Sequence, residues 1–185
     1  MGTDRLRLAI DMDEVIADAF SAQKLWYYET HGYDWDDEVL RGCHFKELAD
    51  PKHAAEMEDL LHKGEFFRDL GVMPGAQDAL LILSERFEIF ITTAAMEYPA
   101  SCAAKFGWLR EHFPFISPLQ IVFCGDKSIL AADYLVDDNV RHFSRFKGQG
   151  ILFSASHNQY VDWRPRVENW TEAVSLLNGF ADLNS

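Results

Sequence analysis

Short apolar runs of strand length alternate with amphipathic helical patterns along most of this 185-residue chain. The runs that are expected to form five strands lie at residues 6–10, 87–92, 121–124, 134–136 and 150–153. Strands that alternate with helices form a mainly parallel sheet, because parallel neighbours need a crossover connection between them. We therefore expect an α/β fold of Rossmann-like type, with helices on both faces of the sheet.

One stretch between the first two strands does not fit this alternation. From residue 33 to about 71 the pattern is helical and acidic, with no convincing strand. Helices along the chain are expected at about 15–30, from 34 onward as one short helix, and at 51–62, 74–83, 99–112 and 171–177. Thr171 is expected to cap the last helix, and residues 154–167 are expected to form a loop. We predict a core domain of residues 1–17 and 72–185, with residues 18–71 as an inserted helical subdomain.

The charge balance excludes several kinds of partner. The chain has 17 basic and 30 acidic residues and a formal charge of -13, which disfavours binding to a nucleic-acid polymer or to an anionic membrane surface. No run approaches the roughly 18 apolar residues of a membrane span, and residues 1–7 are too charged to open a signal peptide. Three cysteines at unrelated spacings suggest neither a disulfide framework nor a zinc site. We expect a cytoplasmic protein that holds any anionic ligand through local cations.

Polar side chains follow four of the five predicted strands. They are Asp11 and Asp13, then Thr92 and Thr93, then Lys127, and finally Asp137 and Asp138. An isolated Asp-x-Asp is most often a turn with an N-cap aspartate. The carboxyl ends of parallel strands meet at one edge of a sheet, however, and that edge is where α/β proteins bind ligands. The sequence therefore predicts one site that contains all of these residues.

This set of residue types suits the chemistry of phosphate esters. Carboxylate oxygens are the ligands that Mg²⁺ prefers, usually together with water and a substrate phosphate. One aspartate can attack phosphorus to form an aspartyl-phosphate, while a second protonates the leaving alcohol and then deprotonates water. Lys127 and the threonine hydroxyls can bind the phosphoryl oxygens, over which the negative charge is spread.

These motifs resemble those of the haloacid dehalogenase superfamily of phosphatases in order and spacing, beginning with Asp11-Met12-Asp13-Glu14-Val15. Within that superfamily the chain is most similar to the 5'(3')-deoxyribonucleotidase family. The finer resemblance rests on Ala17-Asp18 after the first motif, on Phe66-Phe67 before residues 73–76, and on Asp126-Lys127 before residues 135–138. It implies a Mg²⁺-dependent phosphomonoesterase that acts on deoxynucleoside monophosphates.

The resemblance also implies a role for each motif residue. Asp11 would be the nucleophile and a metal ligand, and Asp13 the acid and base, with its backbone carbonyl on the metal. Thr92 would bind the phosphoryl group, and Lys127 would stabilise nucleophile and phosphate. Asp137 would complete the metal shell, supported by Asp138 directly or through water. Residues 18–71 would then form a cap that closes over the substrate.

Two positions depart from the family pattern. Glu14 stands where the better-known members have glycine after the second aspartate, and Gly125 stands where a basic residue is expected before Asp126-Lys127. Both positions lie near the place of the leaving group in the family. They leave the superfamily chemistry intact and bear on the nucleoside preference.

Several alternatives remain open from the sequence. Thr93 can replace or assist Thr92 as phosphate donor, Asp138 can be a helix N-cap, and Asp18 reads as an ordinary charge in a first helical turn. Phe66, Phe67 and Arg68 could contact a nucleobase, or the two aromatic residues could only fill the core. The rival functions are hydrolysis of another small phosphorylated metabolite and a catalytically silent binding protein of the same fold. The sequence does not fix the oligomeric state.

Overall fold

The computed structural model describes residues 5–183, and its centre is a six-stranded parallel sheet. In order across the sheet, the strands are β5 (Ile121–Phe123), β4 (Phe87–Thr93), β1 (Leu6–Asp11), β6 (Tyr134–Asp137), β7 (Gln149–Phe153) and β8 (Arg166–Val167). Asp11 pairs with Thr92 of β4, and Asp137 pairs with Leu152 of β7. The polar ends of the central strands therefore lie at one edge, as predicted.

Helical segments cover both faces of this sheet, which confirms the expected α/β fold. One face packs against α5 (Ala76–Ser84), α6 (Cys102–His112) and α7 (Trp170–Leu183). Leu8 and Ile10 of β1 point into this cluster, while Ala9 belongs to a second cluster with Leu135 and Phe143. That second face is covered by short 3-10 helices, including η5 (Lys127–Ile129) and η6 (Val140–His142), and by the residues that follow them.

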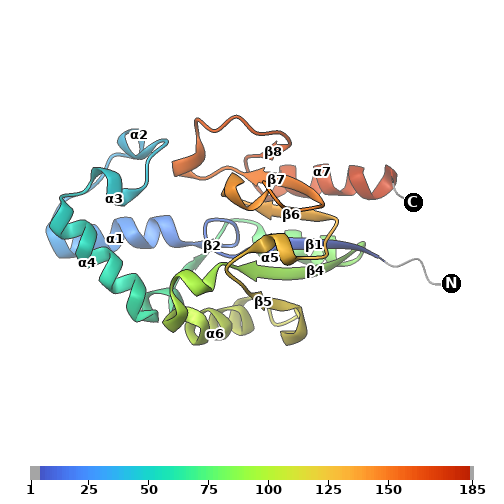
Figure 1. Cartoon of the computed structure of the whole chain (residues 1–185), viewed down its shortest axis with the longest axis horizontal. Coiled ribbons are helices and arrows are strands. Elements are labelled where there is room, and N and C mark those ends of the chain that lie inside the picture. Colours follow the sequence, from blue (N-terminus) through green and yellow to red (C-terminus); the bar gives the residue numbers. More distant parts are fainter. Residues whose placement is uncertain (1–4, 184–185) are drawn as a thin grey trace.

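A helical segment leaves the core after β1 and returns before α5. Its elements are α1 (Ala19–His31), α2 (Asp37–Leu40), α3 (Phe45–Leu48), α4 (Pro51–Lys63) and η1 (Glu65–Arg68). At its base, β2 (Ala17–Asp18) pairs antiparallel with β3 (Gly71–Val72). These helices form one end of the molecule, and the start of β1 and the end of α7 lie at the other (Figure 1). Residues 1–4 and 184–185 of the predicted core lie outside the described residues, and no described helix is long and apolar enough to span a bilayer.

Three local expectations were wrong. The first helix begins at Ala19 rather than at residue 15, because residues 12–17 form a tight turn and Asp18 caps the helix by accepting a hydrogen bond from Ser21 N at 2.9 Å. The last helix begins at Trp170, where the Asn169 side chain accepts from Glu172 N at 3.0 Å, so Thr171 is not the cap. The predicted loop at 154–167 ends in β8, a strand too short for a hydrophobic pattern.

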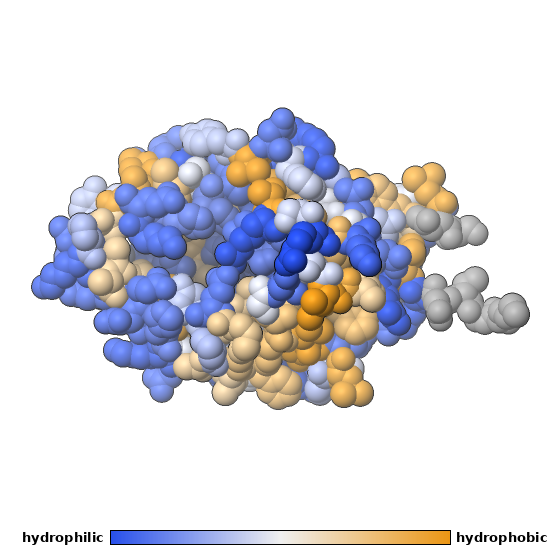
Figure 2. All heavy atoms as spheres, viewed as in Figure 1, coloured by the Kyte–Doolittle hydropathy of each residue, from blue (hydrophilic) through white to orange (hydrophobic). Residues whose placement is uncertain are grey.

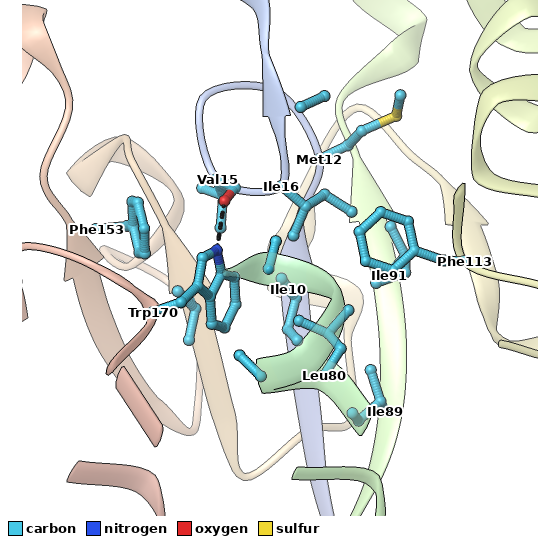
Figure 3. Close-up of a cluster of buried hydrophobic side chains, with 14 of the residues drawn as sticks. Ile10, Met12, Val15, Ile16, Leu80, Ile89, Ile91, Phe113, Phe153 and Trp170 are labelled. Atoms are coloured by element: carbon cyan, nitrogen blue, oxygen red, sulfur yellow. Dashed lines mark hydrogen bonds between the residues drawn. The ribbon is translucent and has the colours of Figure 1, made fainter. Parts of the chain in front are cut away.

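A hydrogen bond from Trp170 holds the turn that follows β1. The indole lies against the core beside Phe153, and its Nε1 donates to the carbonyl oxygen of Val15 at 2.9 Å (Figure 3). Val15 is fully buried, so no solvent reaches its carbonyl oxygen to replace the indole as donor. The last helix thereby holds the corner that carries Asp11 and Asp13.

We expect Trp170→Phe to lower the free energy of unfolding by about 1–3 kcal/mol, because the buried Val15 carbonyl loses its donor while most of the aromatic packing remains. Urea unfolding followed by circular dichroism measures the change. Trp163→Phe is the matched control, since its indole donates at 3.2 Å from a half-buried position. Equal effects of the two substitutions would contradict the special role of the Val15 bond.

Candidate active site

The corner after β1 presents two aspartates at the edge of the sheet. The carbonyl oxygen of Met12 accepts hydrogen bonds from the amides of Ile16 and Ala17, both at 2.9 Å, and so closes the turn. Glu14 lies in the turn with φ 60°, and it is the only non-glycine with positive φ among residues 5–183. The loop brings Ala17 back beside Asp13 in a parallel bridge, which keeps both carboxylates at the strand end.

Three carboxylates meet where β1 and β6 end side by side. One oxygen from each of Asp11, Asp137 and Asp138 lies within 4.8 Å of the others. Asp137 is fully buried, and Asp11 and Asp138 are less than a tenth exposed. An all-oxygen set of this kind fits a hard divalent cation such as Mg²⁺, which offsets the repulsion between carboxylates. The Asp13 carboxylate is not in this group.

Lys127 supplies a buried cation to the same cluster. Its Nζ donates to Asp11 Oδ1 at 2.5 Å and to Asp137 Oδ2 at 2.6 Å, and its side chain is fully buried. The lysine is held there because it begins η5, whose first turn is capped by the Asp126 side chain. A surface role for this lysine is excluded by its burial.

Burial and charge together set the ionisation of the cluster. Burial raises the pKa of Asp11 to about 6, with Asp137 and Asp13 adding to the rise and Lys127 opposing it. Burial and the neighbouring carboxylates also raise the pKa of Asp138 well above its usual value. Burial lowers the pKa of Lys127, but Asp11 and Asp137 outweigh it and hold the pKa above its usual value. The lysine is therefore charged at neutral pH.

The two threonines at the end of β4 point to different partners. Both are fully buried. The hydroxyl of Thr92 donates to the carbonyl oxygen of Ile10 at 3.4 Å, a long bond that a phosphoryl oxygen could replace. The hydroxyl of Thr93 accepts from Lys105 Nζ at 3.0 Å. Either hydroxyl is thus close to the aspartate corner.

Lys105 is a site residue that the sequence reasoning missed. It lies on α6, is 2% exposed, and pairs with the Asp13 carboxylate as well as with Thr93. Its Nζ also lies 4.3 Å from the centre of the Phe67 ring, in cation–π geometry. The sequence did contain a signal for Lys105. The lysine lies on the apolar face of the predicted helix, three and four residues before Trp108 and Leu109, which are buried. A lysine on such a face needs a buried partner.

Asp13 opens onto a pocket of about 240 Å³ between the helical segment and the core. Its Oδ1 is buried and has no hydrogen-bond partner in the described structure. The lining combines polar side chains with Phe20, Phe45, Met57, Leu61 and Phe67 from the helical segment. Hydrophilic residues cover most of the helical end of the face in Figure 2, and the surface is hollowed between that end and the sheet. The pocket suits a ligand with one polar and one apolar part.

The structure separates the three residues predicted to contact a base. Phe67 is buried and lines the pocket, and Phe66 packs half-buried against the main core. Arg68 lies outside the pocket lining and donates to the Glu111 carboxylate at 2.6 Å. Asp138 is not the cap of η6, because the Asn139 side chain accepts from Arg141 N instead.

Glu14 also lines the pocket, in surroundings that disfavour its charged form. Burial raises the pKa of its carboxyl to about 8, and Asp18, Asp13 and Asp11 add to the rise. Its positive φ is costly for a residue with a Cβ, by about 1–2 kcal/mol. A residue kept under such strain is more consistent with function than with stability.

We expect Glu14→Gly to raise the free energy of unfolding of the metal-free protein by about 1–3 kcal/mol at pH 8, because it removes the backbone strain and a half-buried carboxyl that lies near other carboxylates. Glu14→Gln keeps the strain and removes only the charge. Since folding raises the pKa from 4.5 to about 8, the wild type loses stability as pH rises through that window, and the advantage of Glu14→Gln grows with it. Urea unfolding at pH 5 and pH 8 measures both. A glycine variant less stable than the wild type would refute the strain.

Comparison with known proteins gives a consistent result. Residues 5–181 match the family model described as 5' nucleotidase, deoxy (pyrimidine), cytosolic type C protein. A Staphylococcus epidermidis relative is 42% identical over 174 residues, which cover 94% of this chain and 97% of the relative. The Bacillus subtilis 5'(3')-deoxyribonucleotidase is 35% identical over 175 residues, 92% of this chain and 97% of that protein.

The fold has solved counterparts as well. A Bacillus subtilis hydrolase of the haloacid dehalogenase class, solved with magnesium bound, superposes with a TM-score of 0.57 at 14% identity. The superposition covers 95% of this chain and all of that one. At this identity the likeness concerns the fold alone, and it agrees with the α/β architecture described above.

Proposed function

Because the chain belongs to the family of cytosolic type C 5'-nucleotidases, the deoxyribonucleotidases, we propose that it hydrolyses deoxynucleoside monophosphates through an aspartyl-phosphate on Asp11, with Mg²⁺ as cofactor. The chain is a phosphatase of the nucleotidase type. The observation that carries the mechanism is the buried group of Asp11, Asp137 and Asp138, in which the Lys127 ammonium pairs with Asp11 and Asp137. We also propose that residues 18–71 act as the cap and that the enzyme works in the cytoplasm.

The carboxylate oxygens at this site suit Mg²⁺. Asp11, Asp137 and Asp138, with the backbone carbonyl of Asp13, would hold Mg²⁺, and the ion would offset the negative charge that opposes the approach of a phosphate dianion. The magnesium reported for the structural relative supports this choice. A bound dication also favours the ionised form of Asp11, whose pKa is otherwise near 6.

In the first half-reaction, a carboxylate oxygen of Asp11 forms a bond to phosphorus while the bond from phosphorus to the ester oxygen breaks. Asp13 gives its proton to the departing oxygen, so the alcohol leaves neutral. Its Oδ1 is buried and free for this contact, while Oδ2 is held by Lys105. Lys127 and Thr92 bind the phosphoryl oxygens, where charge develops.

In the second half-reaction, Asp13 takes a proton from water as the water oxygen attacks phosphorus. The bond from phosphorus to Asp11 then breaks, which releases inorganic phosphate and restores the Asp11 carboxylate. The two aspartates can divide these tasks because their surroundings differ. Asp11 lies among buried carboxylates, whereas the Asp13 side chain is 30% exposed to the pocket and paired with Lys105.

The pocket favours a nucleoside over a small hydrophilic leaving group. Its apolar wall from the helical segment includes Phe20, Phe45 and Phe67, which could stack on a base. We assign Arg68 no contact with the base, because its guanidinium donates to the Glu111 carboxylate; it is only the sequence neighbour of Phe67. The same chemistry on another small phosphate is the second candidate, and the polar part of the lining favours it. A silent binding protein is disfavoured by the complete set of Asp11, Asp13, Lys127 and Asp137.

Phosphate release from a panel of deoxynucleoside, ribonucleoside, sugar and hydroxy-acid monophosphates tests the proposal. We expect deoxynucleoside monophosphates to be turned over fastest and a chelator to abolish the activity, with recovery on addition of excess Mg²⁺. Equal rates on sugar phosphates would contradict the nucleotide preference. Full activity in the presence of the chelator would contradict the metal requirement.

A further inference from the structure

We propose that the turn at η7 (Ser156–Asn158) couples the position of the helical segment to the metal site, with Asn158 as a positioning residue for Asp138. The inference rests on the proposed role of Asp138 beside the metal. It adds a link between that carboxylate and the cap, through a turn that follows β7. The turn contacts Asp138 on one side and residues 40–44 on the other.

Asn158 fixes the backbone of Asp138. Its side chain is 2% exposed, and its Nδ2 donates to the carbonyl oxygens of Asp138 at 2.7 Å and of Phe153 at 2.8 Å. The last parallel pair between β6 and β7 is Asp137 with Leu152. The Asn158 amide therefore bridges the next pair of residues, where the strands no longer bond to each other. This bridge holds Asp138 beside Asp137 and Asp11.

The turn that carries Asn158 is itself rigid. Its Oδ1 accepts from the amide of Ala155 at 3.1 Å. Arg166 of β8 donates to the carbonyl oxygens of Asn158 and Val161, both at 2.8 Å. Because both the Nδ2 and the Oδ1 of the Asn158 side chain are hydrogen-bonded, the turn has little freedom to move independently of Asp138. Displacement of the turn would thus be transmitted to the carboxylate.

His157 makes the second contact with Asp138 and reaches toward the helical segment. Its Nε2 lies 3.5 Å from Asp138 Oδ2. The same ring stacks on His44, with centroids 4.5 Å apart and an interplanar angle of 17°. His44 directly precedes α3, so a pair of stacked rings joins the carboxylate to the helical segment.

Backbone contacts seat the helical segment on this turn. The amide of Gly42 donates to the carbonyl oxygen of Ser156 at 2.8 Å, and Ser156 Oγ donates to the carbonyl oxygen of Leu40 at 2.9 Å. Gly42 has φ +75°, and a Cβ built on it would lie 2.3 Å from the Tyr160 ring. An alanine at this position would be strained by the positive φ and would have to displace the Tyr160 ring. We call these contacts of residues 40–44 with residues 156–160 the seat.

The coupling must act in both directions. If the seat favours the arrangement of Asp138 that binds metal, then metal must favour the seated arrangement by the same factor. Groups that orient metal ligands typically change metal affinity by about 10–100-fold when removed. Gly42 and Ser156 of the seat make no hydrogen bond with Asp138 in the described part of the chain, so substitutions at these two positions should weaken metal binding only through the turn, even when substrate is absent.

The test measures Mn²⁺ binding in the absence of substrate, and the electron paramagnetic resonance signal of the free ion reports how much is unbound. Mn²⁺ is used because it suits the same oxygen ligands as Mg²⁺. The variants are Asn158→Ser, Ser156→Ala and Gly42→Ala, and circular dichroism confirms that each is folded. Ser144→Ala is the matched control, since its hydroxyl also donates to a backbone carbonyl, that of Arg141 at 3.0 Å, on an exposed turn away from the seat. Asp137→Asn defines the site.

We expect the dissociation constant to rise about 10–100-fold in Asn158→Ser and at least threefold in both seat variants, with Ser144→Ala unchanged. Hydrogen exchange at the Gly42 amide should slow when the wild type binds metal. If Asn158→Ser does not fold, the two seat variants still decide the question. Affinities within twofold of wild type in both seat variants would overturn the coupling while Asp137→Asn still abolishes binding. Failure of the wild type to bind Mn²⁺ through Asp137 would instead overturn the proposed metal site.

Discussion

Asp11→Asn is expected to lower the rate of phosphate release by roughly three orders of magnitude or more while the fold is retained. A carboxamide is a poor nucleophile and a weak ligand for a divalent cation. The fold should survive because Asn occupies the same volume and Lys127 keeps its bond to Asp137 at 2.6 Å. Initial rates at saturating substrate and Mg²⁺ measure the loss, and thermal unfolding verifies the fold.

Asp182→Asn is the matched control for this substitution. Asp182 is an exposed carboxylate near the end of α7, away from the site, and pairs with Arg86 at 2.6 Å. The same chemical change there should leave the rate within a few-fold of wild type. An Asp11→Asn enzyme that turns over near the normal rate would contradict the nucleophilic role of Asp11.

Lys127→Met is expected to reduce both activity and stability. Methionine fills a similar volume, but the buried carboxylates of Asp11 and Asp137 lose the cation between them. Removal of one member of a buried ion pair typically costs about 3–5 kcal/mol. For a chain of this size that corresponds to a decrease in Tm of roughly 6–20 °C. Activity should be lost because the phosphoryl oxygens lose a donor as well.

The cause of this destabilisation can be checked with pH and metal. Without Lys127, the carboxylates bind protons more tightly in the folded than in the unfolded state, so lowering the pH from 7 to 5 should recover part of the lost Tm. Addition of Mg²⁺ should raise the Tm of the variant more than that of the wild type. Lys147→Met, at an exposed lysine, is the control. A variant as stable as wild type in metal-free buffer would contradict the ion-pair arrangement.

The sequence predicted the sheet and the aspartate site because both depend on short-range patterns. Apolar runs marked β1, β4, β6 and β7, and the parallel arrangement then brought Asp11, Thr92 and Asp137 to one edge. Lys127 was found because it follows a strand. Each of these residues belongs to an element that hydrophobic periodicity locates without knowledge of distant contacts.

Other features depend on contacts between distant segments, which periodicity does not report. Lys105 meets Asp13 across 92 residues of sequence, and its helix gave only the hint of a cation on a buried stripe. β8 has two residues and exists because its backbone pairs with β7. The turn at Glu14 escaped detection because a glutamate occupies a backbone conformation that usually indicates glycine.

The most direct test of the central claim is chemical trapping of the covalent intermediate. The enzyme is mixed with a deoxynucleoside monophosphate and Mg²⁺, quenched in acid during turnover, and treated with borohydride, which reduces an acyl phosphate to the alcohol. Peptide mass spectrometry then locates the modified residue. We predict homoserine in place of Asp11 in the wild type and in no other aspartate. An unmodified Asp11 under turnover, or homoserine at Asp13, would contradict the account.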